Sequence, residues 1–142
     1  MQWFKDVIVV HTRAKGLVPV TDAIQQRIDA WRLREGLCVI FLQHTSASLI
    51  INESYDPSAR NDLEVHMDRA VPEDPARYIH TLEGPDDSPS HIRTMLTHTS
   101  LTIPVDEGRL SLGTWQGIYL FEHRTDPQRR RILIRGLSVD GG

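Results

Sequence analysis

Short apolar runs recur along the chain, and their length and β-branched content predict a strand-rich protein. The expected strands cover residues 2–12, 18–20, 37–43, 49–51, 101–105, 110–112, 117–122 and 132–139. The run from Leu37 to Leu42 is apolar at every position. Such a run predicts a strand that is covered on both faces, either by a helix and a second sheet or by a partner subunit.

Three segments have the apolar spacing of helices. Thr21 or Asp22 can cap the first, which Gly36 would end, and Asp56-Pro57 is a strong start for a second that runs to about Ala70. Ser88-Pro89 starts the third by the same logic. His91, Met95 and His98 would then lie on one side of this third helix.

The second predicted helix has two faces of interest. Its buried stripe is expected to consist of Ala59, Leu63, Met67 and Ala70. Asp62 and His66 are four residues apart on another face, where they can pair, although for His66 an exposed surface contact is the better interpretation. The proline-rich stretch 71–90 reads as a long loop, and long loops within compact domains are commonly functional or mobile.

Strands interrupted by helices in this irregular order indicate an α+β fold with mostly antiparallel sheet. A length of 142 residues is most simply one domain, 1–142. The formal net charge of -3 gives no sign of nucleic-acid or membrane binding, and the local run Arg129-Arg130-Arg131 reads as a solvated turn entering a strand. The single Cys38 reads as a buried thiol, and the absence of an apolar leader or span favours the cytoplasm.

The candidate chemistry lies in dispersed histidines and acids. A catalytic zinc site uses about three protein ligands and leaves a position for water or substrate. His44, His80 and His91 suit that count, with Asp62 as a fourth ligand, an orienting partner or a base. The spacing matches no compact zinc signature, and by pattern alone three dispersed histidines are more often unrelated.

A second candidate is the segment from Gly113 to Gly117. Its two glycines suggest a bulge or a close backbone approach that would let Trp115 stack on a ring while Gln116 hydrogen-bonds to it. The alternative, a kink that lets the tryptophan fill the core, is about equally supported.

Taken together, these residues resemble the YjbQ family, formerly uncharacterised protein family 47. The resemblance covers nearly the whole chain and rests on an ordered set of short motifs: His44-Thr45-Ser46-Ala47, Asn52-Glu53, Asp56-Pro57, Asp62, His80, Ser90-His91-Ile92, Pro104-Val105, Gly108-Arg109-Leu110 and Leu112-Gly113-Thr114-Trp115-Gln116. It implies a β-sandwich with about three helices that assembles as a homotrimer. A partner subunit would then cover the second face of the strand at 37–42.

The resemblance also implies a pocket around His44, Asp62, His80 and His91 that holds a divalent metal, zinc or magnesium. The implied activity is that of a secondary thiamine-phosphate synthase, which joins a pyrimidine methyl diphosphate to a thiazole phosphate. On this basis the expected site has three parts: catalytic Asp62, Glu53 and His44; small-molecule substrate binding by Asn52, Trp115, Gln116 and Arg109; and metal binding by His44, His80 and His91.

A synthase of this type needs a divalent ion and positive charge to draw off diphosphate. The candidates are Asp86-Asp87 as magnesium ligands and Arg93, Arg109 or Lys15 as phosphate partners. Metal-activated water suits the histidines and aspartates equally well, so a metal-dependent hydrolase is a competitor, and a non-catalytic trimer that binds a ligand or metal is a third reading. His98 stands where related sequences tend to have glycine, and it is expected to favour the negative end of the helix dipole.

Overall fold

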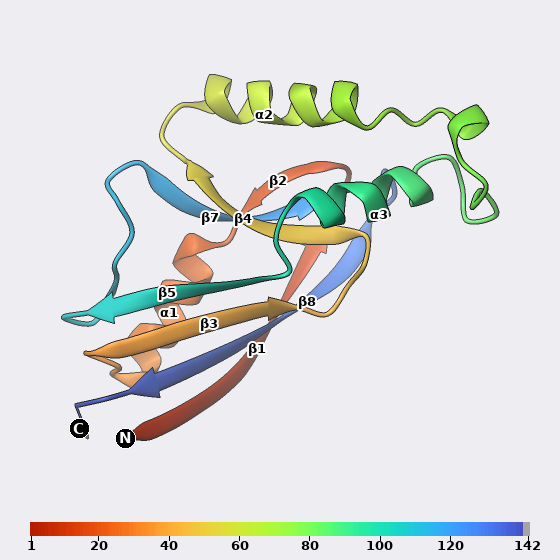
Figure 1. Ribbon diagram of the computed structural model, residues 1–142. Helices are drawn as coiled ribbons and strands as arrows, with labels where there is room; N and C mark the ends of the chain where they lie inside the picture. Colours follow the sequence, from red (N-terminus) through yellow and green to blue (C-terminus); the bar gives the residue numbers. More distant parts are fainter. Residues whose placement is uncertain (141–142) are drawn as a thin grey trace.

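The structure is a computed structural model that describes residues 1–140 of the chain (Figure 1). In chain order the elements are β1 (Gln2–Thr12), β2 (Gly16–Pro19), α1 (Thr21–Trp31), β3 (Gly36–Leu42), β4 (Ala47–Glu53), α2 (Pro57–Ala70), the 3-10 turn η1 (Pro75–Arg77), α3 (Asp87–Leu96), β5 (Ser100–Asp106), β6 (Arg109–Leu110), β7 (Gln116–Glu122) and β8 (Gln128–Ser138). The fold is therefore α+β, as the alternation of strand and helix patterns predicts.

The strands form two antiparallel sheets. The larger has the order β1-β8-β3-β5-β6 and the smaller has the order β2-β7-β4. Alternate residues of β3 and β8, such as Ile40 and Ile134, point into the space between the sheets, where they are fully buried. Helix α1 closes this space with Ile24 and Ile28, which belong to the same apolar cluster. One core thus joins both sheets and the first helix.

The smaller sheet is covered on both faces, because α2 packs on the side away from the core. Leu17, Tyr119 and Phe121 face this side and contact Leu63 and Met67 of α2. In Figure 1 α2 lies over the smaller sheet, and α3 lies beside β4. The doubly covered strand of the structure is therefore β7, whose residues from 117 to 122 are all buried.

Strand β3 was expected to be covered on both faces, and within one chain it is covered on one. Cys38, Ile40 and Leu42 are buried, whereas Leu37 and Phe41 are 40% and 45% exposed. Burial raises the pKa of the Cys38 thiol to about 12, which fits its expected role as a buried apolar side chain.

The helix boundaries differ from the expected ones in two places. Helix α1 ends at Trp31 rather than near Gly36, because Arg32 adopts a left-handed conformation with φ 53° and its N–H closes the last turn. Helix α3 ends at Leu96, so His98 does not lie on it. His98 sits instead in an extended segment, where its carbonyl accepts a hydrogen bond of 2.7 Å from the N–H of Leu49.

Helix α2 begins where Asp56-Pro57 predicts. The Asp56 carboxylate accepts a hydrogen bond from the N–H of Ser58. This bond and a second from the Ser58 hydroxyl lower the pKa of Asp56. In the stripe that was expected to be buried, Leu63 and Met67 are half-buried against the sheet. No residue of α2 is fully buried. The helix therefore rests on the smaller sheet with one narrow face.

The arginine run does not form a turn. Arg129, Arg130 and Arg131 lie within β8, and the alternation of the strand exposes the outer two while it buries Arg130. The guanidinium of Arg130 forms two bonds with the Glu122 carboxylate, at 2.7 and 2.5 Å. The Thr12 hydroxyl donates to the same carboxylate at 2.7 Å. This buried ion pair joins β8 of the larger sheet to β7 of the smaller.

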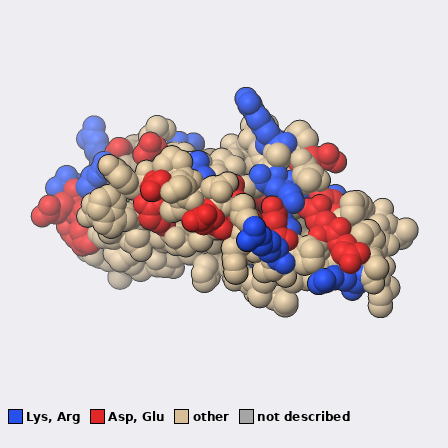
Figure 2. Space-filling model, turned by 90° about the horizontal axis from the view of Figure 1, so that it is seen from above, with Lys and Arg blue, Asp and Glu red and all other residues tan. Residues whose placement is uncertain are grey.

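The face that carries α2 and α3 shows acidic and basic side chains interspersed (Figure 2), which agrees with the formal net charge of -3. Such mixing gives no extended positive field on this face. Within the described part of the chain, no helix is both long enough and apolar enough to cross a membrane.

Candidate functional site

Two histidines and one aspartate converge at the start of α3. Asp87 opens the helix and His91 lies four residues later, so both side chains project from the same face. The Asp87 Oδ2 atom lies 3.1 Å from Nε2 of His91 and 2.6 Å from Nε2 of His80, which arrives from the preceding loop. The potential ligand atoms of the three residues lie within 4.8 Å of one another.

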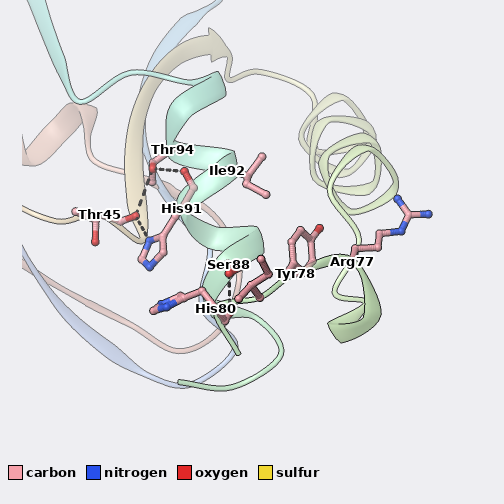
Figure 3. A pocket seen from close by; sticks show the side chains of 9 residues that line it. Thr45, Arg77, Tyr78, His80, Ser88, His91, Ile92 and Thr94 are labelled. Atoms are coloured by element: carbon pink, nitrogen blue, oxygen red, sulfur yellow. Dashed lines mark hydrogen bonds between the residues drawn. The ribbon is translucent and has the colours of Figure 1, made fainter. Parts of the chain in front are cut away.

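Each member of this cluster is held by its surroundings. His91 Nδ1 donates a hydrogen bond of 2.8 Å to the carbonyl of Thr45, just before β4 (Figure 3). The Ser88 hydroxyl donates a hydrogen bond of 2.6 Å to the carbonyl of His80, and this bond connects the loop to α3. The carboxylate of Asp87 is 5% exposed, whereas the two imidazoles are 59% and 38% exposed. The buried carboxylate of Asp87 thus has a fixed position beside two accessible imidazoles.

The hydrogen bond to Thr45 determines the chemical state of His91. A carbonyl only accepts, so Nδ1 carries the proton and the neutral ring presents its Nε2 lone pair to Asp87. A lone pair and a carboxylate oxygen at 3.1 Å repel unless a cation lies between them. Either a proton on the ring or a metal ion can supply that charge, and two imidazoles beside the same oxygen are compatible with both.

The donor set fits a divalent transition metal. Two imidazole nitrogens and one carboxylate oxygen form the three-ligand pattern of catalytic zinc sites, in which the fourth position is open to water or substrate. The N–H of His91 bonded to a backbone carbonyl is the usual orienting contact of a metal-bound histidine.

An open pocket of about 890 Å³ leads to the cluster (Figure 3). His80, His91 and Ser88 form its polar part, and the other walls are provided by Thr45, Arg77, Tyr78, Ile79, Ile92 and Thr94. The Tyr78 hydroxyl is turned back to the carbonyl of Pro72 at 2.8 Å, so its ring forms a fixed side of the pocket. A small, partly apolar molecule would fit beside the two imidazoles.

The sequence analysis assigned His80 and His91 to the site but paired Asp87 only with Asp86 as a magnesium ligand. The four-residue spacing from Asp87 to His91 at a predicted helix start was the signal that pointed to the third member. Asp86 faces the opposite way. Its Oδ2 accepts three bonds from the N–H and hydroxyl of Thr125 and from Arg124, at 2.9 to 3.0 Å.

His44 lies next to this site but outside the cluster. Its Nε2 accepts a hydrogen bond of 2.8 Å from the N–H of Arg131. Burial and the nearby Arg130 charge lower the pKa of His44, so its ring is neutral at neutral pH. His44 lines a neighbouring depression that shares Thr45 and Thr94 with the main pocket. In this conformation Nε2 is occupied by that hydrogen bond. The assignment of His44 as a metal ligand stays a prediction.

Asp62 and His66 lie elsewhere, on α2. Both side chains are exposed. Within residues 1–140 no ion pair joins them, and the exposed surface position expected for His66 is observed. Asp62 does not belong to the cluster of His80, Asp87 and His91. The catalytic role expected for Asp62 stays a prediction.

Except for Arg109, the remaining predicted residues lie at the far end of β4. The Glu53 carboxylate accepts the N–H groups of Tyr55 and Asp56 at 3.0 and 3.1 Å, and the Asn52 side chain accepts the N–H of Glu53. Trp115 is 57% exposed and meets Tyr55 edge to face, with ring centroids 5.0 Å apart. The core-filling alternative for this tryptophan is thus wrong.

Gly117, one of the two glycines that flank Trp115 and Gln116, has no room for a side chain. A Cβ on Gly117 would lie 2.4 Å from Cβ of Ser54, so the close backbone approach expected here is present. The Gln116 side-chain oxygen accepts the N–H of Gly113 at 2.7 Å. Because β4 is seven residues long, its two ends are about 20 Å apart. Within one chain, the predicted substrate residues at the end of β4 therefore lie far from the histidines.

The three candidate phosphate partners do not line the pocket beside the histidines. Arg93 is buried and donates to the carbonyl of Val71. Lys15 pairs with Asp68 and Glu73, and Arg109 lies on the hairpin between β5 and β6. None supplies positive charge to the cavity in this chain.

A buried histidine was missed by the sequence analysis. His123 is fully buried after β7, and its Nε2 lies 2.9 Å from the Ser48 hydroxyl. Burial, reinforced by the charges of Arg93 and Arg130, lowers the pKa of His123 to about 3. Neither the main pocket nor the depression beside it is lined by Ser48 or His123. The apolar run before His123 was a hint of its burial in the sequence.

Comparison with known proteins agrees with this fold. The family model described as UPF0047 protein YjbQ-like matches residues 5–138. The chain is 46% identical to the UPF0047 protein YjbQ of Escherichia coli O157:H7 over 132 residues, which cover 92% of this chain and 95% of that protein. It is 45% identical to a UPF0047 protein of Synechocystis over 130 residues, which cover 92% and 88% of the two chains.

Solved structures show the same arrangement. A YbjQ-like protein of unknown function from Sulfolobus solfataricus superposes with a TM-score of 0.87 at 26% identity, over 96% of this chain and 98% of that one. A conserved hypothetical protein from Thermus thermophilus gives a TM-score of 0.83 at 30% identity, over 93% and 99%. From the family match, the identities and the shared fold, we conclude that this chain belongs to the UPF0047 YjbQ-like family.

Proposed function

We propose that this protein is a metal-dependent hydrolase of a small substrate, with His80, Asp87 and His91 as its metal ligands. The observation that carries the proposal is the N–H of His91 bonded to the Thr45 carbonyl, which directs the Nε2 lone pair at a buried carboxylate. Zinc suits two imidazoles and one carboxylate better than magnesium, which prefers oxygen ligands.

His80, Asp87 and His91 would hold the ion, and the chemistry that it would supply when bound is a lowered pKa of water, so that hydroxide is available near neutral pH. The chain supplies the geometry for that step. Asp87 offers Oδ2 from a buried position, and His91 is fixed through Thr45. Tyr78 and Ile92 provide apolar walls that would hold the substrate body beside the two imidazoles. The hydroxyls of Ser88 and Thr94 lie along the same wall.

The synthase-type activity implied by the family resemblance is the second candidate. A divalent ion at the same cluster would bind a diphosphate leaving group, which supports this reading. Lys15, Arg93 and Arg109 lie away from the cavity, and Arg77 is the basic residue that lines it. This shortage of positive charge for a diphosphate supports hydrolysis instead. Arg77 itself pairs with Asp74 at 3.5 Å.

Metal binding is tested first. We expect protein purified without added metal to take up one zinc per chain, and His91→Ala to lower the affinity by at least about 10–100-fold, because a direct ligand is lost. His66→Ala, an exposed histidine outside the cluster, is the matched control and should bind as the parent does. Unchanged zinc uptake by His91→Ala would disprove the ligand assignment.

The two activities are separated by their substrates. A hydrolase should turn over a single phosphate-ester or amide substrate in water when zinc is present. A synthase should release diphosphate only when the pyrimidine diphosphate and the thiazole phosphate are both supplied. Release from the pyrimidine compound alone would support hydrolysis and count against the synthase.

We also propose that the protein assembles as a homotrimer through the outer face of the larger sheet. The register pairs Trp3 and Leu37 with Leu137, so these side chains lie on one face together with Phe41 and Leu133. Three of them are exposed in the single chain, at 57%, 40% and 45% for Trp3, Leu37 and Phe41. Lys5 and Arg135 are paired with each other on the same face, so only part of this face is apolar. An exposed apolar patch of this kind is usually covered by a partner.

A further inference from the structure

Arg124 stands behind the cluster of His80, Asp87 and His91, in the loop between β7 and β8. Its side chain is 19% exposed and its Nη1 donates to Oδ1 of Asp87 at 2.5 Å. The two oxygens of Asp87 thus have separate partners. Oδ1 is bound to the guanidinium, and Oδ2 faces the two imidazoles.

The same guanidinium holds the loop that carries His80. Its Nε donates to Oδ2 of Asp86 at 3.0 Å, and its Nη2 donates to the carbonyl of Glu83 at 2.9 Å. Three positions of one segment, Glu83, Asp86 and Asp87, are therefore bound by three nitrogens of one planar group. A lysine ammonium cannot reproduce this, because it is a single point charge without a planar fork.

Arg124 is itself anchored to the buried ion pair that joins the sheets. Its backbone N–H donates to Oε2 of Glu122 at 3.1 Å, and the same carboxylate is bound by Arg130. The neighbouring Thr125 binds Asp86 through its N–H and its hydroxyl, both at 2.9 Å. The loop after β7 is thus a rigid support that reaches the site from the core.

We propose that Arg124 is a positioning residue of this site: it holds Oδ1 of Asp87, so that Oδ2 alone is presented to an ion between His80 and His91. This inference rests on the proposed metal site. Partners that orient a metal ligand typically change metal affinity by about 10–100-fold when they are removed. Arg124 would act through Asp87 and through the loop, without touching the ion.

The experiment is a titration of the metal-free protein with cobalt(II), in which visible absorbance reports both affinity and coordination. We expect Arg124→Lys to weaken cobalt binding by about 10–100-fold and to change the absorption spectrum, because Asp87 is then free to rotate. Arg27→Lys is the matched control, since Arg27 forms an ion pair of 2.6 Å with Asp6 far from the loop. It should keep the parental affinity and spectrum.

A second variant separates positioning from folding. Arg124→Ala leaves a space that methylguanidinium can fill, and we expect millimolar methylguanidinium to restore most of the lost affinity and the parental spectrum. The urea midpoint of Arg124→Ala, measured with and without methylguanidinium, reports the structural role. Cobalt affinity that is restored while the midpoint stays unchanged supports positioning, whereas affinity that only follows the midpoint would overturn it. If Arg124→Lys does not fold, as judged by circular dichroism, Asp86→Asn removes one anchor of the guanidinium and should weaken cobalt binding by a smaller factor.

The outcomes distinguish this inference from the proposed function. Cobalt binding in the parent that is lost in Asp87→Asn but unchanged, in affinity and spectrum, in the Arg124 variants would overturn the role of Arg124 alone. A parent that binds no cobalt would overturn both the metal site and the positioning role.

Discussion

At the scale of single residues, the histidines differ in what their second ring nitrogen meets. Nδ1 of His91 donates to a backbone carbonyl and leaves Nε2 for a cation. Nε2 of His44 accepts a backbone N–H, which occupies the atom that would otherwise bind a metal. His123 is enclosed beside Ser48. Identical side chains therefore have three roles. A backbone group determines the role of His91 and of His44, and burial beside a hydroxyl determines that of His123.

The buried His123 predicts a pH-dependent stability. Its pKa is about 3 in the folded chain, whereas an ordinary histidine has a pKa of 6.5, so below pH 6.5 the unfolded chain binds a proton that the folded chain does not. The free energy of unfolding should therefore fall as the pH drops from about 6.5 towards 3, by about 1.4 kcal/mol per pH unit from this group.

Urea unfolding between pH 6.5 and 4.5 measures this effect. The free energy of unfolding of His123→Gln should change less steeply with pH than that of the parent, because glutamine keeps a partner for Ser48 and does not titrate. His66→Gln, on the exposed face of α2, should keep the parental slope. Equal slopes for the parent and His123→Gln would contradict the prediction.

At the scale of elements, the two ends of β4 carry different groups of predicted site residues. The start of the strand follows Thr45, whose carbonyl orients His91 of α3. Its end carries Glu53, whose carboxylate organises the turn into α2. One strand thus connects the candidate metal site to the exposed aromatic pair of Tyr55 and Trp115. In the single chain these are two separate surfaces.

The ion pair between β7 and β8 predicts a large effect of one substitution. Glu122 is fully buried and Arg130 is 4% exposed, so Glu122→Gln would leave a buried guanidinium without its counter-charge. We expect the free energy of unfolding to fall by about 3–5 kcal/mol. Arg129→Gln, one residue along the same strand but exposed, is the control and should change stability by less than about 0.5 kcal/mol.

Chemical denaturation at neutral pH gives both values. Because Glu122 also accepts the N–H of Arg124, the variant should lose metal affinity as well as stability. A Glu122→Gln protein as stable as the parent would show that the pair contributes little to holding the sheets together.

At the scale of the whole molecule, the larger sheet has one face packed on the core and one face open. The open face presents apolar side chains from β1, β3 and β8 in register, and in the described part of the chain no helix covers it. Helix α1 lies in the core, and α2 and α3 lie on the side of the smaller sheet (Figure 1). A trimer that buries this face would explain why β3 is apolar at every position.

This arrangement predicts that a charge on the open face dissociates the assembly. Phe41→Asp should shift the mass measured by light scattering from a trimer to a monomer, because a carboxylate cannot be buried against an apolar partner. Val65→Asp on α2, 36% exposed on the other side of the molecule, is the control and should remain trimeric. A parent protein that is monomeric at micromolar concentration would disprove the proposed assembly.

Local sequence rules determined most of the elements. Apolar runs located the strands, and Asp56-Pro57 located the start of α2, because these features act through neighbours along the chain. The rules failed in two ways. The run from Arg129 to Arg131 became part of a strand because a contact with Glu122 in another strand neutralises Arg130. Helix α1 ended early for a local reason, because Arg32 adopts a left-handed conformation that glycine usually supplies.

The sequence alone also determined the family and the chemistry available, through the ordered motifs around His44, His80 and His91. Only the tertiary structure decided which of these side chains meet. Asp87 and His91 meet because they lie one turn apart on α3, whereas Asp62 and Glu53 are separated from them by α2 and the length of one strand. Only the tertiary contacts decide the rest: Arg124 and Ser88 hold the loop that brings His80 to Asp87, and Thr45 orients the ring of His91. Arg124 and Thr45 lie more than thirty residues away from the cluster, and no local pattern of residues encodes contacts over that separation.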